Sequence, residues 1–376
     1  MINFNEPLST GREIGYIQEA IENRKICGDG IFTKKCNKWL ADNTGAKKAL
    51  LTTSCSHAIE MAVLLCGIYA GDEVIMPSYN FSSSANAVAL RGATAVFVDI
   101  RPDTMNIDEE KIESAITDKT KAIIVVHYAG VSCEMNRIME LAEQYRIKVI
   151  EDAAQGMMCS YYGKPLGSIG DFGCYSFHET KNYTMGEGGA LLINDGQYIE
   201  PAEIIREKGT DRSKFCRGQI DKYTWVGIGS SYLPSDLNAA YLWPQLEVAD
   251  KINERRMTLW NQYYESLSVL KENNIIDLPS VPIGCVHNGH MFYIKVNDVL
   301  ERSALISYLK DRDIQSQFHY LPLHTSTGGI RYGKCVGDCE HTMIESERLL
   351  RLPMHFYLSE GDVCRVCNTI KEFYGC

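Results

Sequence analysis

From about residue 47, short apolar runs alternate with stretches of helical periodicity, and this alternation constrains the fold more than any other feature of the chain. The apolar runs KALLTT, EVIMP, TAVFVDI, KAIIVV and KVIED are continuous, which is typical of strands buried on both faces. Helical stretches such as SHAIEMAVLLCGIYAG and MNRIMELAEQYR separate them. The pattern predicts a mainly parallel mixed sheet covered by helices, with ligands at the carboxyl ends of its strands.

The character of the chain changes after about residue 235, where the long helical region SDLNAAYLWPQLEVADKINERRMTLWNQYYESL begins. Pro244 is its internal kink signal. Beyond it, MFYIKV, RSALISYLKDRD, QSQFHY and a terminal helix follow. Because 376 residues exceed the usual size of one hydrophobic core, we expect a large α/β domain at 1–245 and a smaller C-terminal α/β domain at 246–376, joined by a long helix.

Charge and composition narrow the class of partner. A formal net charge of -10 disfavours a nucleic-acid partner, because phosphate backbones are bound by clustered Lys and Arg. No apolar run approaches the roughly 18 residues of a membrane span, and the first residues lack the regions of a signal peptide. We therefore expect a cytoplasmic protein with no membrane partner.

The fourteen cysteines are scattered without the spacing of a disulfide scaffold. Two closely spaced couples, Cys335 with Cys339 and Cys364 with Cys367, have a spacing that zinc sites also use. The second couple lies in an amphipathic helical segment, where free cysteines act as small buried side chains. We expect no metal and leave zinc as the alternative for these couples.

Asp152 follows the apolar run KVIE and therefore lies at the carboxyl end of a buried strand. A carboxylate there is costly unless it has a cationic partner. A protonated pyridine nitrogen is one such cation, and a carboxylate keeps it protonated. An acid that caps the next helix is the alternative.

Lys181 follows the next apolar run, CYSFH, and precedes the glycine-rich segment Gly186–Gly189. A lysine at a strand end can form a Schiff base when its surroundings keep the amine partly neutral. The alternative is a solvated surface lysine, the usual fate of this residue. The glycines match neither a P-loop nor a dinucleotide fingerprint and are most simply turn residues.

The segment Thr52–His57 closes a strand and opens a helix. Free N–H groups and small hydroxyl side chains at a helix N-terminus form an anion site, although an ordinary N-cap explains the serines as well. The presence of a strand-end acid and a strand-end lysine after it, in this order on a parallel sheet, favours a phosphate site in this segment over an ordinary N-cap.

These residues resemble the sugar aminotransferase family of fold type I pyridoxal-phosphate (PLP) enzymes, with the aspartate aminotransferase-like fold. The resemblance spans nearly the whole chain. Within the family, the segments GDEVIMPSYNF, VFVDIRPDTMNIDE, EDAAQG, SFHETKNYT and RGQIDKYTW are similar to the subgroup that makes dTDP-4-amino-4,6-dideoxygalactose for the enterobacterial common antigen.

The resemblance implies a role for each matching residue. Lys181 would be the Schiff-base lysine and proton shuttle, and Asp152 the partner of the pyridine nitrogen. Gln155 would contact the phenolic oxygen of the cofactor, and Phe81 would stack on its ring. Phosphate-binding positions fall on Ser54, Cys55 and Ser176.

Two departures from the family stand out. An asparagine that relatives present to the phosphate of the neighbouring subunit is replaced by Ser231 in the segment that ends at Leu233, so either the Ser231 hydroxyl substitutes for it or the contact is lost. An Asn-His-Gly stretch of the family here reads Glu207-Lys208-Gly209. A role for Lys208 is therefore doubtful. Weaker candidates for substrate contact, each equally explained as a loop or core residue, are Arg212, Lys214, Arg217, Lys222, Tyr223, His319, Tyr320 and His324.

The activity implied is transamination of dTDP-4-dehydro-6-deoxy-D-glucose with L-glutamate, in a homodimer with shared active sites, with pyridoxamine phosphate (PMP) as the second cofactor form. Amination at another ring position is the nearest alternative. Related sugar dehydratases carry histidine in place of Lys181, and an NAD-dependent oxidoreductase would need a G-x-G-x-x-G turn that is missing here. A cofactor-binding regulator without turnover is the remaining alternative.

Overall fold

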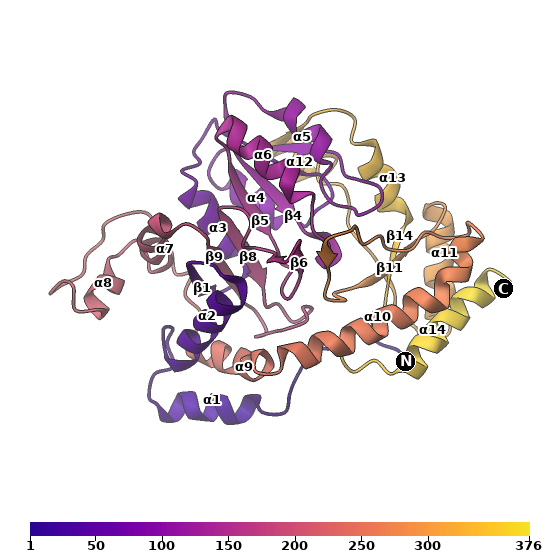
Figure 1. The fold of residues 1–376 in the computed structure, drawn as a ribbon, viewed down its shortest axis with the longest axis horizontal. Coiled ribbons are helices and arrows are strands. Elements are labelled where there is room, and N and C mark those ends of the chain that lie inside the picture. The colour runs from indigo at the N-terminus through magenta and orange to yellow at the C-terminus, as the bar shows by residue number, and fades with distance from the viewer.

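A twisted eight-stranded sheet forms the centre of the computed structural model, which describes residues 1–376 (Figure 1). Its strand order is β1-β9-β8-β5-β4-β2-β3-β13. Only β9 runs antiparallel to its neighbours, which confirms the mainly parallel mixed sheet. The strands are β1 (Lys48–Thr52), β2 (Glu73–Pro77), β3 (Thr94–Val98), β4 (Thr120–Val126), β5 (Lys148–Asp152), β8 (Phe172–Ser176), β9 (Gly189–Ile193) and β13 (Gly333–Cys335).

Both faces of this sheet are covered because successive residues of each strand point to opposite sides. Ile123 and Val125 of β4 belong to one hydrophobic core, and Ala122 and Ile124 belong to the other. The first core packs under α1 (Glu13–Glu22), α2 (Ile31–Thr44), α5 (Glu109–Ala115), α6 (Met135–Tyr145) and α9 (Asp236–Leu246), and the second under α3 (Cys55–Leu65), α4 (Ser83–Ala89) and α7 (Ile199–Arg206).

The long helical region predicted after residue 235 is divided. Helix α9 contains Pro244 and ends at Leu246, and α10 (Ala249–Glu272) continues along the lower edge of the molecule towards the C-terminal elements (Figure 1). There, a third hydrophobic core joins α10 to the elements that follow it. They are α11 (Val299–Lys310), α14 (Glu360–Phe373) and the sheet β11-β14-β12, formed by β11 (Phe292–Lys295), β12 (Gln317–Phe318) and β14 (Leu349–Leu352).

The C-terminal part also reaches back to the large sheet, because β13 pairs in parallel with β3. A further small sheet combines strands from both parts of the chain. The division into two domains at residue 245 stays a prediction. The remaining elements are β6 (Ser160–Tyr161), β7 (Lys164–Pro165), β10 (Cys285–Val286), α8 (Arg212–Cys216), α12 (Thr327–Tyr332), α13 (Glu340–Arg348) and the short 3-10 turns η1 (Tyr128–Gly130) and η2 (Gly196–Tyr198).

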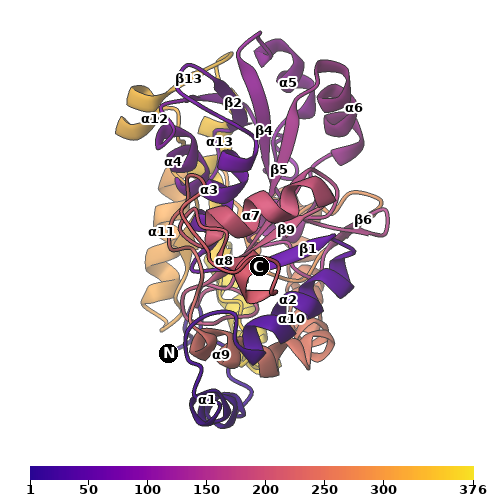
Figure 2. The same ribbon diagram turned by 90° about the vertical axis from the view of Figure 1, so that its left-hand side faces the viewer.

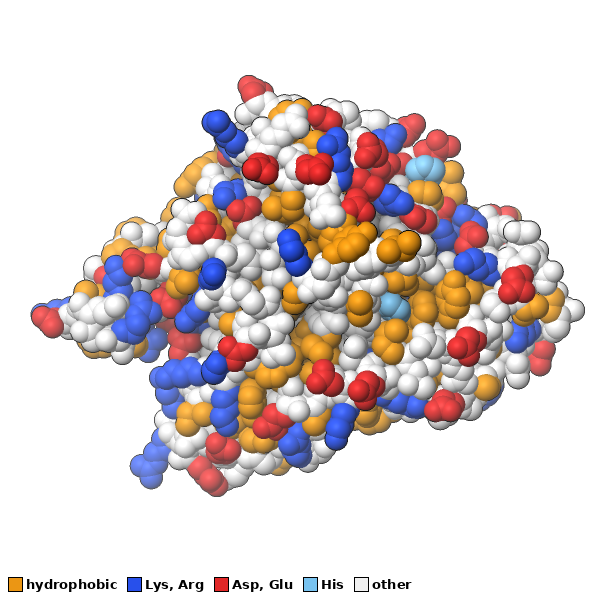
Figure 3. All heavy atoms as spheres, viewed as in Figure 1, with side chains coloured by type: hydrophobic (Ala, Val, Ile, Leu, Met, Phe, Trp, Pro, Cys, Tyr) orange, Lys and Arg blue, Asp and Glu red, His pale blue; other side chains and the backbone are white.

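Residues around α8 project from the body of the molecule as an arm, which faces the viewer when the molecule is turned (Figures 1 and 2). In the space-filling view this arm carries both basic and acidic side chains (Figure 3). None of the helices combines the length and the apolar character needed to cross a membrane.

Candidate active site

A cavity of about 850 Å³ lies at the carboxyl ends of the central strands, between the large sheet and the C-terminal elements. Parallel strands bring residues that are distant in sequence to this edge. Nine of the residues singled out in the sequence line this cavity: Ser54, Cys55, Phe81, Asp152, Gln155, Ser176, Lys181, His319 and Tyr320.

Asp152 ends β5 and is only 6% exposed. Its Oδ2 accepts a 2.9 Å hydrogen bond from Ser84 Oγ, and its Oδ1 accepts one of 3.3 Å from the N–H of Ala154. Burial nevertheless raises the pKa of Asp152 above its ordinary value. A cationic N–H group in the cavity would relieve this cost, so the carboxylate fits a protonated ring nitrogen.

Lys181 lies in the turn that follows β8, where its N–H donates a 2.9 Å hydrogen bond to the carbonyl of His178. Burial lowers the pKa of Lys181, and the nearby positive charge of Arg351 lowers it further. Cys55 and Asp152 oppose this shift. A larger fraction of the amine is therefore neutral than on a surface lysine, which suits attack on a carbonyl group and proton transfer.

The N-terminus of α3 forms one wall of the cavity through Ser54 and Cys55. Ser54 is the N-cap, and its Oγ accepts a 3.1 Å hydrogen bond from the N–H of His57. The first-turn N–H groups have no intrahelical acceptor, so they can bind an anion. Gly189 of β9 permits this arrangement, because a Cβ at that position would lie 2.4 Å from the backbone nitrogen of Cys55.

Gln155 is buried at the base of the cavity, and its orientation is fixed by a backbone contact. Its Oε1 accepts a 2.6 Å hydrogen bond from the N–H of Ala129. Because a backbone N–H can only donate, the Nε2 amino group of Gln155 is the end left for other partners. It is a donor of the kind that a phenolate oxygen accepts.

Aromatic side chains form the opposite wall. Phe81 is 59% exposed, and its ring centroid lies 6.2 Å from that of Tyr320. The Tyr128 hydroxyl lies 3.1 Å from Nδ1 of His319. The backbone carbonyl of His319 accepts a hydrogen bond from the Tyr79 hydroxyl. Burial lowers the pKa of His319 well below its ordinary value, so this wall is neutral and suits a flat ring or a sugar.

Arg351 is a cavity residue that sequence reasoning missed. It lies on β14, the central strand of the small sheet, and its guanidinium group lies 4.8 Å from the centroid of the Phe4 ring. Its Nε is buried without a hydrogen-bond acceptor. The RLLRLP segment does not show that its second arginine faces a cavity. Which face of a strand is turned towards a cavity is decided only by the pairing of that strand with its neighbours.

Eight of the predicted residues lie outside the cavity of this single chain: Lys208, Arg212, Lys214, Arg217, Lys222, Tyr223, Ser231 and His324. Ser231 is exposed, and its backbone forms an isolated antiparallel β-bridge with Glu207. The Glu207 carboxylate forms ion pairs with Lys208 at 2.9 Å and with Arg212 at 3.5 Å. Lys222 and Tyr223 are exposed on the arm. The chain by itself therefore does not bring these residues to Lys181.

The cysteine couples are separated in the fold. Cys364 and Cys367 lie on α14, where Cys367 packs in the third core. Cys335 and Cys339 lie together at the edge of the large sheet, beside His324. A four-cysteine cluster is not formed.

The chain is similar to known proteins over nearly its whole length. The family model described as "DegT/DnrJ/EryC1/StrS aminotransferase family" matches residues 8–371. GDP-perosamine synthase of Caulobacter vibrioides is 32% identical over 99% of this chain and 98% of its own. The spore coat polysaccharide biosynthesis protein SpsC of Bacillus subtilis is 31% identical over 98% of this chain and 96% of its own.

A solved structure shows the same fold. A putative sugar aminotransferase, Spr1654 of Streptococcus pneumoniae, superposes in its PMP form with a TM-score of 0.92, at 26% identity and over 99% of both chains. Its PLP form superposes with a TM-score of 0.91. Family, relatives and fold agree with a cavity suited to a phosphate, a protonated ring nitrogen and a reactive lysine, and the chain belongs to the DegT/DnrJ/EryC1/StrS family of PLP-dependent sugar aminotransferases.

Proposed function

We propose that this aminotransferase moves the amino group of L-glutamate to the keto carbon of dTDP-4-dehydro-6-deoxy-D-glucose, giving dTDP-4-amino-4,6-dideoxy-D-galactose. The observation that carries the chemistry is the meeting of Lys181, Asp152 and the N-terminus of α3 in one cavity. The choice of sugar rests on the similarity of segments such as SFHETKNYT and RGQIDKYTW to one subgroup of the family.

The residues that fit PLP divide its binding between them. The first-turn N–H groups of α3, with Ser54 and Ser176, would hold the phosphate. Asp152 would face the ring nitrogen, Gln155 the phenolic oxygen, and Phe81 the ring. When bound, the cofactor withdraws electrons from the carbon atom that exchanges the amino group and carries that group from one substrate to the other.

Lys181 supplies the proton chemistry. Because burial and Arg351 lower its pKa, the neutral amine would accept a proton from the α-carbon of glutamate and deliver it to the cofactor carbon that takes up the amino group. In the second half of the cycle the same group works in reverse on the sugar. Tyr320 and His319 form the neutral wall along which the sugar ring would lie.

Arg351 would bind a carboxylate of the amino donor. Its guanidinium group lies in the cavity beside Phe4, and its Nε has no acceptor in the protein. Arg and carboxylate groups form strong paired hydrogen bonds in such settings. An amino-acid donor such as glutamate suits this arrangement, and a donor without a carboxylate does not.

The arm around α8 supports a homodimer. It exposes several large apolar side chains, Phe215, Tyr223, Trp225, Val226 and Ile228, of which Trp225 is 76% exposed. A contiguous apolar segment of this kind marks an interface, and two-fold dimers are the commonest closed assembly. The arm would bring Ser231, and basic residues such as Lys222, to the cavity of the partner subunit.

The decisive experiment incubates the PLP-loaded protein with L-glutamate and dTDP-4-dehydro-6-deoxy-D-glucose. Formation of 2-oxoglutarate together with an amino sugar, whose configuration at C4 is read by NMR, would support the proposal. The corresponding GDP-linked 4-keto sugar serves as the competing acceptor, because one relative is a GDP-perosamine synthase. Preference for the GDP sugar, a gluco product, or amination at C3 would overturn the choice of substrate.

A further inference from the structure

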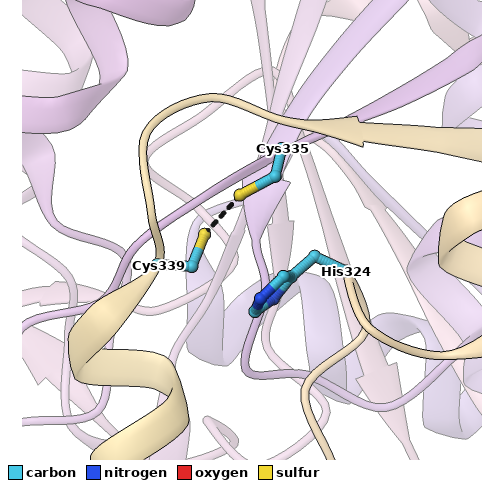
Figure 4. A group of neighbouring side chains, drawn as sticks. All are labelled: His324, Cys335 and Cys339. Carbon is cyan, nitrogen blue, oxygen red and sulfur yellow. Dashed lines mark hydrogen bonds between the residues drawn. The ribbon is translucent and has the colours of Figure 1, made fainter.

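A second group of reactive side chains lies outside the cavity, at the edge of the large sheet. His324 comes from the loop before α12, Cys335 and Cys339 lie at the two ends of the connection between β13 and α13, and the three side chains point into one common space (Figure 4). Their ligand atoms all lie within 4.8 Å of one another, and the two Sγ atoms are 2.7 Å apart. Neither thiol forms a disulfide.

Both thiols are carried by backbone anchored to β3. Cys335 ends β13 opposite Phe97, and the N–H of Val336 donates a 2.9 Å hydrogen bond to the Phe97 carbonyl. Cys339 is the residue before α13, whose start is fastened by Asp99. The Asp99 carboxylate accepts hydrogen bonds from the N–H of His341 at 2.9 Å and from the N–H of Thr342 at 2.7 Å.

His324 is oriented by a buried serine. Its Nδ1 lies 2.6 Å from Ser78 Oγ, and the N–H of Leu323 donates a 2.9 Å hydrogen bond to the Ser78 carbonyl. This leaves Nε2 as the ring nitrogen without such a contact. A histidine that binds a metal through one nitrogen commonly has the other fixed by a hydrogen bond of this kind. Ser78 therefore orients His324 as a ligand.

The donor set selects the class of ion. Two sulfur atoms and one imidazole nitrogen suit Zn²⁺ and disfavour Mg²⁺ and Ca²⁺, which prefer oxygen ligands. Thiolates on a tetrahedral zinc ion lie about 3.8 Å apart for Zn–S bonds of about 2.3 Å. The thiols must therefore separate by about 1 Å, for which Cys335, an exposed residue, has room.

We infer that His324, Cys335 and Cys339 bind one Zn²⁺ ion, with water in the fourth position. The sequence alone led us to expect no metal, because the third ligand becomes a neighbour only through the fold. The ion would fasten the segment that carries His319 and Tyr320, two residues of the cavity wall, to β13 and α13. It would act as a brace for that wall and not as a participant in amino transfer.

The test uses the full-length, cofactor-loaded protein, reduced and freed of metal with a chelator, and then titrated with ZnCl₂ against a colorimetric zinc indicator. We expect one equivalent to bind, and we expect Cys335→Ser, Cys339→Ser and His324→Asn each to weaken binding by about tenfold or more. Cys364→Ser is the matched control, because Cys364 is an exposed cysteine of the other couple, and it should bind zinc as the wild type does.

Two results would overturn the inference. One is zinc binding that is equally strong in wild type and in Cys335→Ser. Because Cys335 is exposed, this substitution should leave the fold intact, so weaker binding by the variant reports the loss of a ligand. The other is a wild-type protein that binds no zinc after reduction. This holds also where the purified chain first contains a disulfide between Cys335 and Cys339 and the reduction opens it. Zinc should also raise the Tm of the wild type and leave that of Cys335→Ser unchanged.

Discussion

Ser84 Oγ donates a 2.9 Å hydrogen bond to Oδ2 of Asp152 and itself accepts one of 3.0 Å from Nδ2 of Asn80. Because the Asn80 amide occupies one lone pair of Ser84, the hydroxyl proton is committed to Asp152. Helix α4, which carries Ser84, therefore orients the carboxylate at the end of β5.

Replacing Ser84 should shift the pH dependence of cofactor binding. The carboxylate form of Asp152 is the form that binds a protonated ring nitrogen, so affinity is full above the raised pKa of Asp152 and is lost as pH falls through it. Ser84→Ala removes a hydrogen bond that lowers this pKa, so the loss should begin at a higher pH. At neutral pH we expect affinity about fivefold weaker, for a hydrogen bond of about 1 kcal/mol.

PLP titrations of the cofactor-free chain from pH 5 to 8 measure this effect, and Asn86→Ala on the same helix serves as the control. The phosphate of PLP titrates equally in every variant, so the difference between variants isolates Asp152. Identical pH profiles for Ser84→Ala and wild type would contradict the role of Ser84.

Lys181→Ala should abolish amino transfer and remove the visible absorbance of lysine-bound cofactor. The rate should fall about 10⁴-fold or more, as for other residues that carry covalent and proton-transfer roles together. Lys38→Ala, at an exposed ion pair with Asp42, should retain the absorbance and the rate. Spectra of both variants after incubation with PLP and removal of the excess decide the matter, and a Lys181→Ala protein that shows the same lysine-bound absorbance as the wild type would refute the assignment.

Glu151 and Asp152 are neighbours with opposite tasks, because they point to opposite faces of β5. Glu151 is fully buried, and its carboxylate accepts hydrogen bonds from the N–H groups of Gly167, Ile169 and Gly170 at 2.6–2.7 Å and contacts His127 Nε2 at 2.9 Å. Glu151→Gln should cost about 2–4 kcal/mol, because an amide group cannot accept at both ends.

Urea unfolding measures this free energy, with Asp152→Asn as the matched variant. Asp152→Asn should lose activity about a hundredfold or more while changing the stability of the cofactor-free chain far less than Glu151→Gln does. Equal losses of stability in the two variants would contradict the assignment of a structural role to Glu151 and a catalytic role to Asp152.

Arg351→Gln should raise the KM for L-glutamate much more than the KM for the keto sugar. A charge-assisted pair with a carboxylate contributes about 2 kcal/mol or more, so the expected rise is about thirtyfold. Steady-state kinetics with each substrate varied in turn give the two values. Arg348→Gln is the control, because Arg348 lies three residues away in the sequence and forms ion pairs with Glu345 and Asp277. An unchanged KM for glutamate in Arg351→Gln would exclude donor binding by Arg351.

Trp225→Asp should weaken the proposed dimer. Trp225 is 76% exposed in the single chain, and burial of a tryptophan at an interface contributes about 2 kcal/mol or more, so the dimer Kd should rise about thirtyfold. Sedimentation at several concentrations measures it. Ile283→Asp alters another highly exposed apolar residue, 90% exposed, outside the arm, and should leave the dimer intact.

The sequence by itself determined the order of strands and helices, the parallel sheet, the position of Asp152 at a strand end and the position of Lys181 after one. It did so because continuous apolar runs report burial on both faces, and parallel strands send their carboxyl ends to one edge. The helix N-terminus at Ser54 could also be predicted from the sequence, because helix capping depends on neighbouring residues in the chain.

Only the tertiary structure decided which side chains from other segments reach that edge. Arg351 comes from the small sheet, Ser84 from α4, and His324 joins Cys335 and Cys339 across the fold. Local patterns carry no record of contacts between residues far apart in the chain. Packing of α4 against the sheet brings Ser84 to Asp152, and packing of the C-terminal elements against the sheet supplies Arg351, part of the cavity walls and the proposed zinc site.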